Sequence, residues 1–525
     1  MLTHARIPSR VVPFVLGVCI APGLAAQKAR PDPRLARLDT YIEKTRVEWK
    51  VPAIAVAIVK DDSVVFAKGY GTLEIGGSRK TDENTLFAIG SASKAFTTAA
   101  LGMLVDEGKL RWSDPATKYL PSLQLPDPWV TRELTVRDLV THRVGLDRGD
   151  ALWELTDLSR EEVLRRQRFL GRIASFRAAY GYNNNMFLAA GQIIPAVTDT
   201  SWDDFVRTRI LDPLGMRRTR TSTKPLASMD NVATPHAIVD DYQVIPVPWH
   251  NIDNIGPAGS INSSAIEMAQ WMRLQLGGGT YGGRRLIASK TLADLHEPQT
   301  VIRREPWLSN LSPVNHHLMI PGSHFALYGT GWFLQDYRGR KVVIHGGAID
   351  GMRAMVGMVP EERLGVVALT NLNPTSADIA IVFRAFDEYF GGATRDWSHE
   401  ILQSFKAQIS RAVEARAKAE AQRVAGTSPS LPLEKYVGSY ADSAYGAADV
   451  KEEGGHLVMR YGTATGDLVH WHYDTFQVQW RRPTRDRSFV TFTIGADANP
   501  TSLRTAGIPE LKRVKPAERT ASAPR

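Results

Sequence analysis

Cysteine is almost absent from this chain of 525 residues, which contains only Cys19. A single cysteine excludes an internal disulfide framework, and it excludes zinc sites and iron–sulfur clusters that need several thiolates. The His-Glu-x-x-His pattern is also missing. The adjacent pair His316 and His317, and the alternating pair His470 and His472, would each need a further ligand. We therefore expect neither a metal nor a cofactor.

Long runs of one charge are missing as well. Lys and Arg number 64 against 55 Asp and Glu, a formal net charge of +9 at pH 7, but no five or six like charges stand together. This balance predicts a solvated surface and no nucleic-acid partner. With 43% hydrophobic residues the chain can bury real cores, which excludes a disordered or fibrous protein. A length of 525 residues predicts about two to four folded units.

A hydrophobic run long enough to cross a membrane is missing from the N-terminus. The apolar run over residues 11–24 is shorter than the ~20 residues that a spanning helix needs. Two arginines precede it and small alanines follow it, which is typical of a secretory signal peptide over residues 1–26, cleaved near Ala26. We expect a secreted or periplasmic protein with no stable membrane span after cleavage. A lipoprotein signal ending at Cys19 is a weaker alternative, because the bulky Val18 precedes it.

The pattern of apolar residues predicts an α+β fold. Two β-rich stretches at residues 51–59 and 64–67 flank a polar turn, so the folded part is expected to open with a hairpin. A helical period begins near Ser91. Residues 112–214 are mostly helical and punctuated by proline, and strands return over residues 328–371 as a meander. This order predicts one antiparallel sheet with flanking helices and a helical subdomain.

A second unit is expected at the C-terminus. Residues 396–426 are predicted to form a connector helix, and the Pro- and Ser-rich residues 427–433 a linker. Apolar residues then alternate with period two, which predicts a small antiparallel β domain or barrel over residues 434–515 and a disordered tail at 516–525. Three roles stay open for this unit: capping the site, binding a polymer or mediating assembly.

The candidate nucleophile is Ser91 in the sequence Ser91-Ala92-Ser93-Lys94. Residues three apart lie on one face of a helix, so the Lys94 amine can approach the Ser91 hydroxyl. The positive end of the helix dipole also favours an alkoxide and later an oxyanion. Taken alone, Ser-x-x-Lys is a weak signal, because a chain of this length holds one or two by chance.

Two further motifs follow in a fixed order. Tyr182-Asn183-Asn184 precedes an apolar run, and His345-Gly346-Gly347 directly follows a β-rich stretch. Together the three motifs resemble those of the serine β-lactamase and penicillin-binding protein family, closest to its class C-like branch with esterases and D-amino-acid peptidases. Other family landmarks are matched at residues 141–146, where Val144 replaces a serine, 213–216, 257–260 and 370–371. The resemblance covers roughly residues 35–390, which are assigned to the β-lactamase-like domain. The C-terminal region resembles the lipocalin-like module that often follows such domains.

The resemblance implies a role for each motif residue. Ser91 would become acylated, and Lys94 and Tyr182 would transfer its proton, which requires a shifted pKa in at least one of them. Asn184 would orient the substrate. The backbone N–H groups of Ser91 and Ala348 would form the oxyanion hole. Which of Lys94 and Tyr182 is the general base stays open.

The third motif departs from the family. Its usual Lys-Thr-Gly supplies a cation and a hydroxyl for the substrate carboxylate, whereas this chain has His345 and Gly346 before Gly347. His345, Gly346 and Gly347 are expected to line the wall of the substrate site opposite Asn184. Because a neutral histidine and a glycine bind a carboxylate poorly, we expect esters, amides or short peptides to be better substrates than β-lactams.

The predicted function is an exported serine hydrolase that acts on small molecules or peptides, with cell-wall material as a further possible partner. An α/β-hydrolase is disfavoured because no Gly-x-Ser-x-Gly occurs in the chain. Two alternatives use the same residues. One is a penicillin-binding or acyl-sensing protein without efficient turnover, supported by the lack of an assignable deacylating glutamate, and the other is an acyltransferase.

Overall fold

A computed structural model describes residues 32–239, 242–303, 323–392, 395–482 and 487–514, together with Met1 and Thr3. The expected signal peptide, apart from those two residues, lies outside the described residues, as do His316, His317 and the tail at 516–525. None of the helices in the described ranges combines the length and the apolar character needed to cross a membrane.

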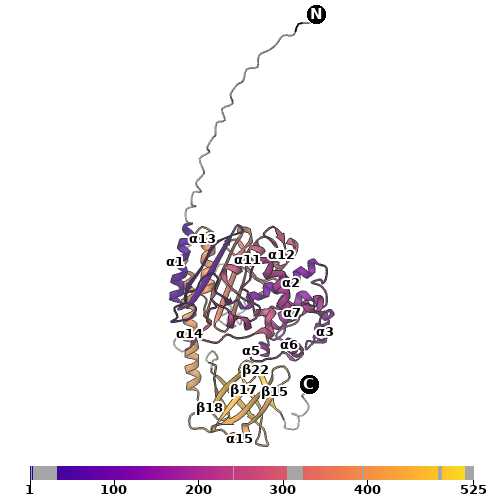
Figure 1. Ribbon diagram of the computed structural model, residues 1–525. Helices are drawn as coiled ribbons and strands as arrows, with labels where there is room; N and C mark the ends of the chain where they lie inside the picture. Colours follow the sequence, from indigo (N-terminus) through magenta and orange to yellow (C-terminus); the bar gives the residue numbers. More distant parts are fainter. Residues whose placement is uncertain are drawn as a thin grey trace.

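An eight-stranded antiparallel sheet forms the centre of the larger body (Figure 1). From edge to edge its strands are β2 (Ser63–Gly71), β1 (Ala53–Lys60), β14 (Leu364–Thr370), β13 (Met352–Val359), β12 (Arg340–Ile349), β11 (Phe333–Tyr337), β10 (Ala326–Tyr328) and β9 (Thr300–Val301). The hairpin β1–β2 and the meander β11–β14 are confirmed, and β10 extends the sheet beyond the predicted strands. The sheet joins the first and last parts of this body, because β1 pairs with β14.

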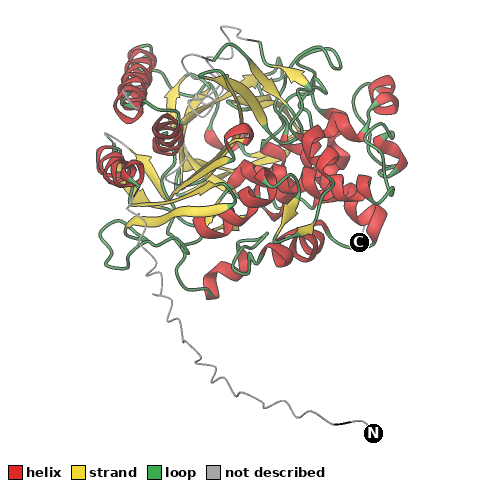
Figure 2. Cartoon of the chain, turned by 90° about the horizontal axis from the view of Figure 1, so that it is seen from above, coloured by secondary structure: helices red, strands yellow, loops and turns green. Residues whose placement is uncertain are grey.

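Helices cover both faces of the sheet (Figure 2). These are α1 (Pro33–Glu48) and α13 (Ala377–Tyr389) on one side and α11 (Ala265–Leu276) on the other. Successive residues of a strand point to opposite faces. A β carbon at Gly357 would meet Phe386 of α13, whereas one at Gly365 would meet Met272 of α11. The sheet is thus the middle of three layers, as expected for the α+β class.

Helix α1 corrects one expectation, because the folded part opens with a helix and not with the hairpin. Pro33 occupies the first turn, and the Asp32 carboxylate accepts a hydrogen bond from the backbone N–H of Arg34 at 2.9 Å. Only a narrow stripe that includes Leu38 and Ile42 is buried. The remainder of the helix is polar, so its apolar periodicity is weak and the sequence did not reveal it.

A helical region lies beside the sheet and is larger than the subdomain predicted over residues 112–214, because it also contains the buried helix α2 (Lys94–Asp106) and short helices that follow residue 250. The other helices of this region are α3 (Pro128–Glu133), α4 (Val136–Leu139), α5 (Ala151–Glu154), α6 (Arg160–Arg165), α7 (Asn184–Thr198), α8 (Trp202–Val206), α9 (Asp212–Leu214), α10 (Gly256–Gly259) and α12 (Ser289–Leu295). Helix α2 packs against α7, α8, α10 and α12, so it is held from several sides.

The C-terminal unit is a closed barrel of eight antiparallel strands, reached through the long helix α14 (Trp397–Ala421) and the short α15 (Leu433–Tyr436) (Figure 1). Its strands are β15 (Gly438–Asp442), β16 (Gly446–Glu453), β17 (His456–Tyr461), β18 (Ala464–His472), β19 (Thr475–Trp480), β20 (Ser488–Ile494), β21 (Pro500–Thr505) and β22 (Ile508–Arg513). Pairing of β15 with β22 closes the barrel. Tyr436, Tyr440, Phe476 and Phe492 pack together with ring centroids 5.0–5.7 Å apart, so side chains fill its core.

Candidate active site

Ser91 lies in a tight turn that delivers it to the start of α2. Residues Gly90–Ser93 form a 3₁₀ helix, and the α-helix itself begins at Lys94. In a 3₁₀ helix residues three apart are eclipsed, which brings the side chains of Ser91 and Lys94 together. Ser91 is partly exposed, whereas the neighbouring residues Ala92, Ser93 and Lys94 are buried. The hydroxyl is therefore accessible at the end of a buried helix.

Lys94 is fully buried, and its amine has no carboxylate partner among its hydrogen bonds. Nζ lies 3.0 Å from Ser91 Oγ, 2.7 Å from Asn184 Oδ1 and 2.8 Å from the carbonyl oxygen of Ala258 in α10. Burial holds the pKa of Lys94 well below its usual value. The positive charge of Arg148 lowers this pKa further.

A neutral Lys94 suits the role of a base. An uncharged amine has two N–H groups and one lone pair. The two N–H groups fit the oxygens of Asn184 and Ala258, which accept at 2.7 and 2.8 Å. The lone pair is then left for the Ser91 hydroxyl, the partner at 3.0 Å.

Tyr182 lies next to both groups, just before α7. The Asn183 side chain caps this helix by accepting a hydrogen bond from the backbone N–H of Met186 at 3.0 Å. The Tyr182 ring centroid is 4.8 Å from Lys94 Nζ. Burial raises the pKa of the Tyr182 phenol above its usual value, and a hydrogen bond with Ser91 opposes this rise. The phenol therefore stays protonated at neutral pH and can donate a proton.

Asp150, which the sequence did not reveal, fixes the orientation of Asn184. Its Oδ1 accepts hydrogen bonds from Asn184 Nδ2 at 3.0 Å and from Trp153 Nε1 at 2.9 Å. The Arg148 guanidinium donates to its other oxygen. Because the amide nitrogen of Asn184 is held by Asp150, the amide oxygen faces Lys94. The only sequence signal was the position of Asp150 a few residues after the family-like segment 141–146.

Strand β12 lies directly against the nucleophile turn, with two glycines at the point of contact. A β carbon at Gly347 would lie 1.8 Å from the carbonyl oxygen of Ile89 and 2.9 Å from the nitrogen of Ser91. A β carbon at Gly90, where φ is +49°, would lie 2.7 Å from the nitrogen of Ala348. The backbones approach this closely because neither residue has a side chain. The turn that carries Ser91 and the Gly347–Ala348 part of β12 are therefore in close backbone contact, which is the placement expected if the N–H groups of Ser91 and Ala348 form an oxyanion hole.

The first two residues of the third motif point to opposite faces of β12, with His345 on the face of Gly347. His345 is buried, with Nε2 3.4 Å from the Tyr328 hydroxyl and its ring packed on Phe333 at 5.0 Å. A β carbon at Gly346 would meet the end of the Met355 side chain, on the opposite face of β12. The structure thus brings Ser91, Lys94, Tyr182, Asn184, Gly347 and Ala348 together, and the substrate contacts expected of His345 and Gly346 stay predictions.

His142 lies in the family-like segment 141–146, but the sequence assigned no role to it; its ring packs against that of Tyr182. The two rings are 4.2 Å apart, and His142 Nδ1 accepts a hydrogen bond from the backbone N–H of Asn183 at 3.1 Å. Burial holds the pKa of His142 well below its usual value. This histidine is therefore a neutral positioning residue. Throughout the described ranges, no three or more His, Cys, Asp or Glu residues gather in a way that could hold a metal ion.

Comparison with known proteins agrees with this geometry. The family profile described as Beta-lactamase matches residues 38–386, and a domain of unknown function, DUF3471, matches residues 422–518. The unguisins hydrolase ungD of Aspergillus violaceofuscus is 29% identical over 459 residues, which is 80% of this chain and 78% of the relative.

Two solved structures share the fold. The octameric penicillin-binding protein homologue from Pyrococcus abyssi has a TM-score of 0.60 at 21% identity, covering 91% of this chain and 99% of that one. A D-stereospecific amidohydrolase from Streptomyces sp. has a TM-score of 0.54 at 21% identity, covering 68% and 99%. Because the family profile matches more than half of the length of this chain, the chain belongs to the beta-lactamase family.

Proposed function

We propose that this protein is an exported serine hydrolase that cleaves esters, amides or short peptides through an acyl-enzyme on Ser91. The observation that carries the proposal is the 3.0 Å contact between Ser91 Oγ and the Nζ of a fully buried lysine, Lys94. The names of two similar proteins, a hydrolase and an amidohydrolase, agree with this chemistry. Export rests on the signal-peptide pattern of residues 1–26.

In the proposed acylation, Ser91 Oγ attacks the substrate carbonyl carbon while Lys94 Nζ accepts the hydroxyl proton. The carbonyl oxygen becomes an oxyanion, to which the backbone N–H groups of Ser91 and Ala348 donate. When the bond to the leaving group breaks, the Tyr182 phenol gives it a proton and regains one from Lys94. Water then attacks the acyl carbon, its proton passes to the same pair, and Ser91 leaves protonated. The pKa directions of Lys94 and Tyr182 favour the lysine as base and the phenol as acid.

Substrates without an essential carboxylate fit this site best. The Lys-Thr pair that serves a carboxylate in relatives is replaced by His345, which is buried against Tyr328 and Phe333, and by Gly346. Neither supplies a permanent cation or a hydroxyl at this position. We therefore propose that nitrophenyl esters and D-amino-acid amides are hydrolysed faster than nitrocefin.

Two variants are expected to move the pH dependence in opposite directions. kcat/KM requires neutral Lys94, so it rises with pH through the Lys94 pKa. The charge of Arg148 lowers this pKa and that of Asp150 raises it. Arg148→Gln should therefore move the acidic limb of the pH profile to higher pH, and Asp150→Asn to lower pH. Both pH profiles are measured with the same ester. If the acidic limb moves in the same direction in both variants, the assignment of this limb to Lys94 is contradicted.

Kinetics with a small substrate panel tests the function itself. Wild-type protein is expected to hydrolyse a nitrophenyl ester or a D-amino-acid amide with a steady rate that continues after any burst. Ser91→Ala should remove this rate while the melting temperature stays close to that of the wild type. A burst of one equivalent with no later rate would support the acyl-sensing alternative. Added amines or alcohols that appear in the product would instead identify an acyltransferase.

A further inference from the structure

The barrel touches the catalytic body beside the residues that hold Asn184. Its β17–β18 turn consists of Gly462 and Thr463. The carbonyl oxygen of Leu155, next to α5, accepts hydrogen bonds from the backbone N–H of Thr463 at 2.7 Å and from its hydroxyl at 3.3 Å. A β carbon at Gly462 would lie 1.8 Å from the same oxygen. Helix α5 also carries Trp153, which donates to Asp150.

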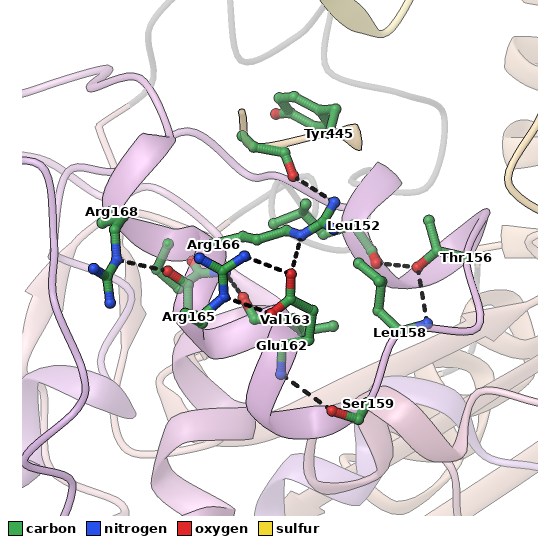
Figure 3. A network of polar contacts seen from close by, with 12 residues as sticks. Leu152, Thr156, Leu158, Ser159, Glu162, Val163, Arg165, Arg166, Arg168 and Tyr445 are labelled. Atoms are coloured by element: carbon green, nitrogen blue, oxygen red, sulfur yellow. Dashed lines mark hydrogen bonds and ion pairs between the residues drawn. The ribbon is translucent and has the colours of Figure 1, made fainter. Parts of the chain in front are cut away.

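The β15–β16 turn of the barrel makes a second contact with this flank. Arg166 Nη1 donates to the carbonyl oxygen of Ala444 at 3.2 Å, and Figure 3 shows Tyr445 of this turn facing the segment that contains Leu152 and Arg166. The turn is well defined, because Asp442 Oδ1 accepts from the N–H groups of Ala444 and Tyr445 at 2.7 and 3.0 Å. The turn is thus fixed against the catalytic body.

Tyr445 lies at this contact, in the β15–β16 turn. The residue is 6% exposed. Burial, with the nearby charges of Asp147, Asp442 and Asp150, raises the pKa of its phenol to about 12. Asp150 binds Asn184, which in turn binds Lys94 at 2.7 Å. The barrel therefore lies within a few side chains of the nucleophile on this flank.

The opposite flank is also touched by the barrel. Arg482, after β19, forms an ion pair with Asp350 in the β12–β13 turn, with Nη2 and Oδ2 2.7 Å apart. Asp350 is two residues beyond Ala348, which corresponds to at most about 7 Å of extended chain. The barrel therefore contacts the catalytic body at two places near Ser91, one close to the residues that hold Asn184 and the other close to Ala348.

We propose that the docked barrel forms one wall of the substrate site and restricts the enzyme to compact substrates, with Tyr445 and Arg482 as specificity-determining residues. This inference rests on the proposed hydrolase function. A long substrate that extends from Ser91 between the two flanks meets the barrel. Since side chains fill the core of the barrel, the barrel offers no passage through its lumen to such a chain.

Two glycines of the barrel give a matched test. Gly462 and Gly454 both lie in hairpin turns with φ of +55° and +59°, so alanine strains both turns alike. Only at Gly462 does the new β carbon collide with the catalytic body, since nothing lies within 4 Å of one at Gly454. Gly462→Ala should therefore release the turn, which faster hydrogen exchange at the Thr463 amide would report.

The measured quantity is kcat/KM for an extended peptide nitroanilide divided by kcat/KM for nitrophenyl acetate. Gly462→Ala is expected to raise this ratio by about tenfold, and Gly454→Ala to leave it unchanged. An unchanged ratio in Gly462→Ala, with faster exchange at Thr463, would overturn the inference. If nitrophenyl acetate is not hydrolysed by the wild type, the hydrolase function itself fails, so the two failures are distinguishable.

A charge exchange supplies a second test should Gly462→Ala fold poorly. Arg482→Asp places two acids at the second contact and is expected to raise the ratio, because like charges repel the barrel from the β12–β13 turn. Adding Asp350→Arg restores an ion pair of reversed sense and should return the ratio toward the wild-type value. If the double variant keeps the raised ratio of the Arg482→Asp variant, docking of the barrel does not restrict the substrate and the inference is contradicted.

Discussion

Replacing Lys94 with methionine is expected to lower kcat/KM for a nitrophenyl ester by about 10²–10⁴-fold, the usual contribution of a general base. Methionine keeps a similar length and apolar stem but has no lone pair that can take the Ser91 proton efficiently. The loss should appear in the burst phase, because acylation is the step in which Lys94 accepts that proton. Stopped-flow kinetics with substrate in excess over the enzyme measures the rate of this burst.

Folding needs a separate control in this experiment, because Lys94→Met leaves the oxygens of Asn184 and Ala258 without a donor. Circular dichroism and the melting temperature show whether the variant remains folded. Lys68→Met changes an exposed lysine of β2 and should keep the wild-type rate. A folded Lys94→Met protein with an undiminished burst would refute Lys94 as the base.

Replacing Gly347 with alanine is expected to lower kcat/KM by about 10²–10³-fold or more, the cost of one misplaced oxyanion donor. The new β carbon would lie 1.8 Å from the carbonyl oxygen of Ile89, so β12 must move away from the nucleophile turn. That movement separates the N–H groups of Ser91 and Ala348. The melting temperature should fall as well, because the contact is between backbones and cannot be relieved by a side-chain rotation.

Gly346 provides the matched control for this substitution. A β carbon there would lie 2.9 Å from the flexible end of the Met355 side chain and at an ordinary contact distance, 3.5 Å, from the carbonyl oxygen of Ala354. Gly346→Ala is therefore expected to retain most of the activity and stability, although it is adjacent and adds the same methyl group. Equal losses in Gly346→Ala and Gly347→Ala would show that the proposed oxyanion hole is not the reason for the defect.

The sequence predicted those parts of the molecule that have a local signature. Short apolar runs between turn residues revealed β11–β14, most of whose residues are buried on both faces of the sheet. The alternation of apolar residues revealed the barrel, because strands with one buried face repeat every two residues. Ser91, Lys94, Tyr182 and Asn184 were found because their motifs occur in a family order. Helix α1 was missed because its buried stripe is narrow, and the weak periodicity resembled a polar loop.

Other features depend on contacts between distant segments. Asp150 matters because it lies beside Asn184, and it has no recognisable spacing of its own. His142 belongs to the family-like segment 141–146, but only its contact with Tyr182 reveals its role. Gly462 and Gly454 are equivalent turn glycines in the sequence, yet only Gly462 touches the catalytic body. Such distinctions follow from tertiary packing, which periodicity and motifs do not encode.

Mapping the covalent adduct of a fluorophosphonate probe tests the acyl-enzyme on Ser91 most directly. The intact mass is expected to show one adduct per chain, and peptide sequencing should locate this adduct on Ser91. A folded Ser91→Ala protein should carry no adduct. An adduct on another residue, or labelling that persists in Ser91→Ala, would contradict the acyl-enzyme on Ser91.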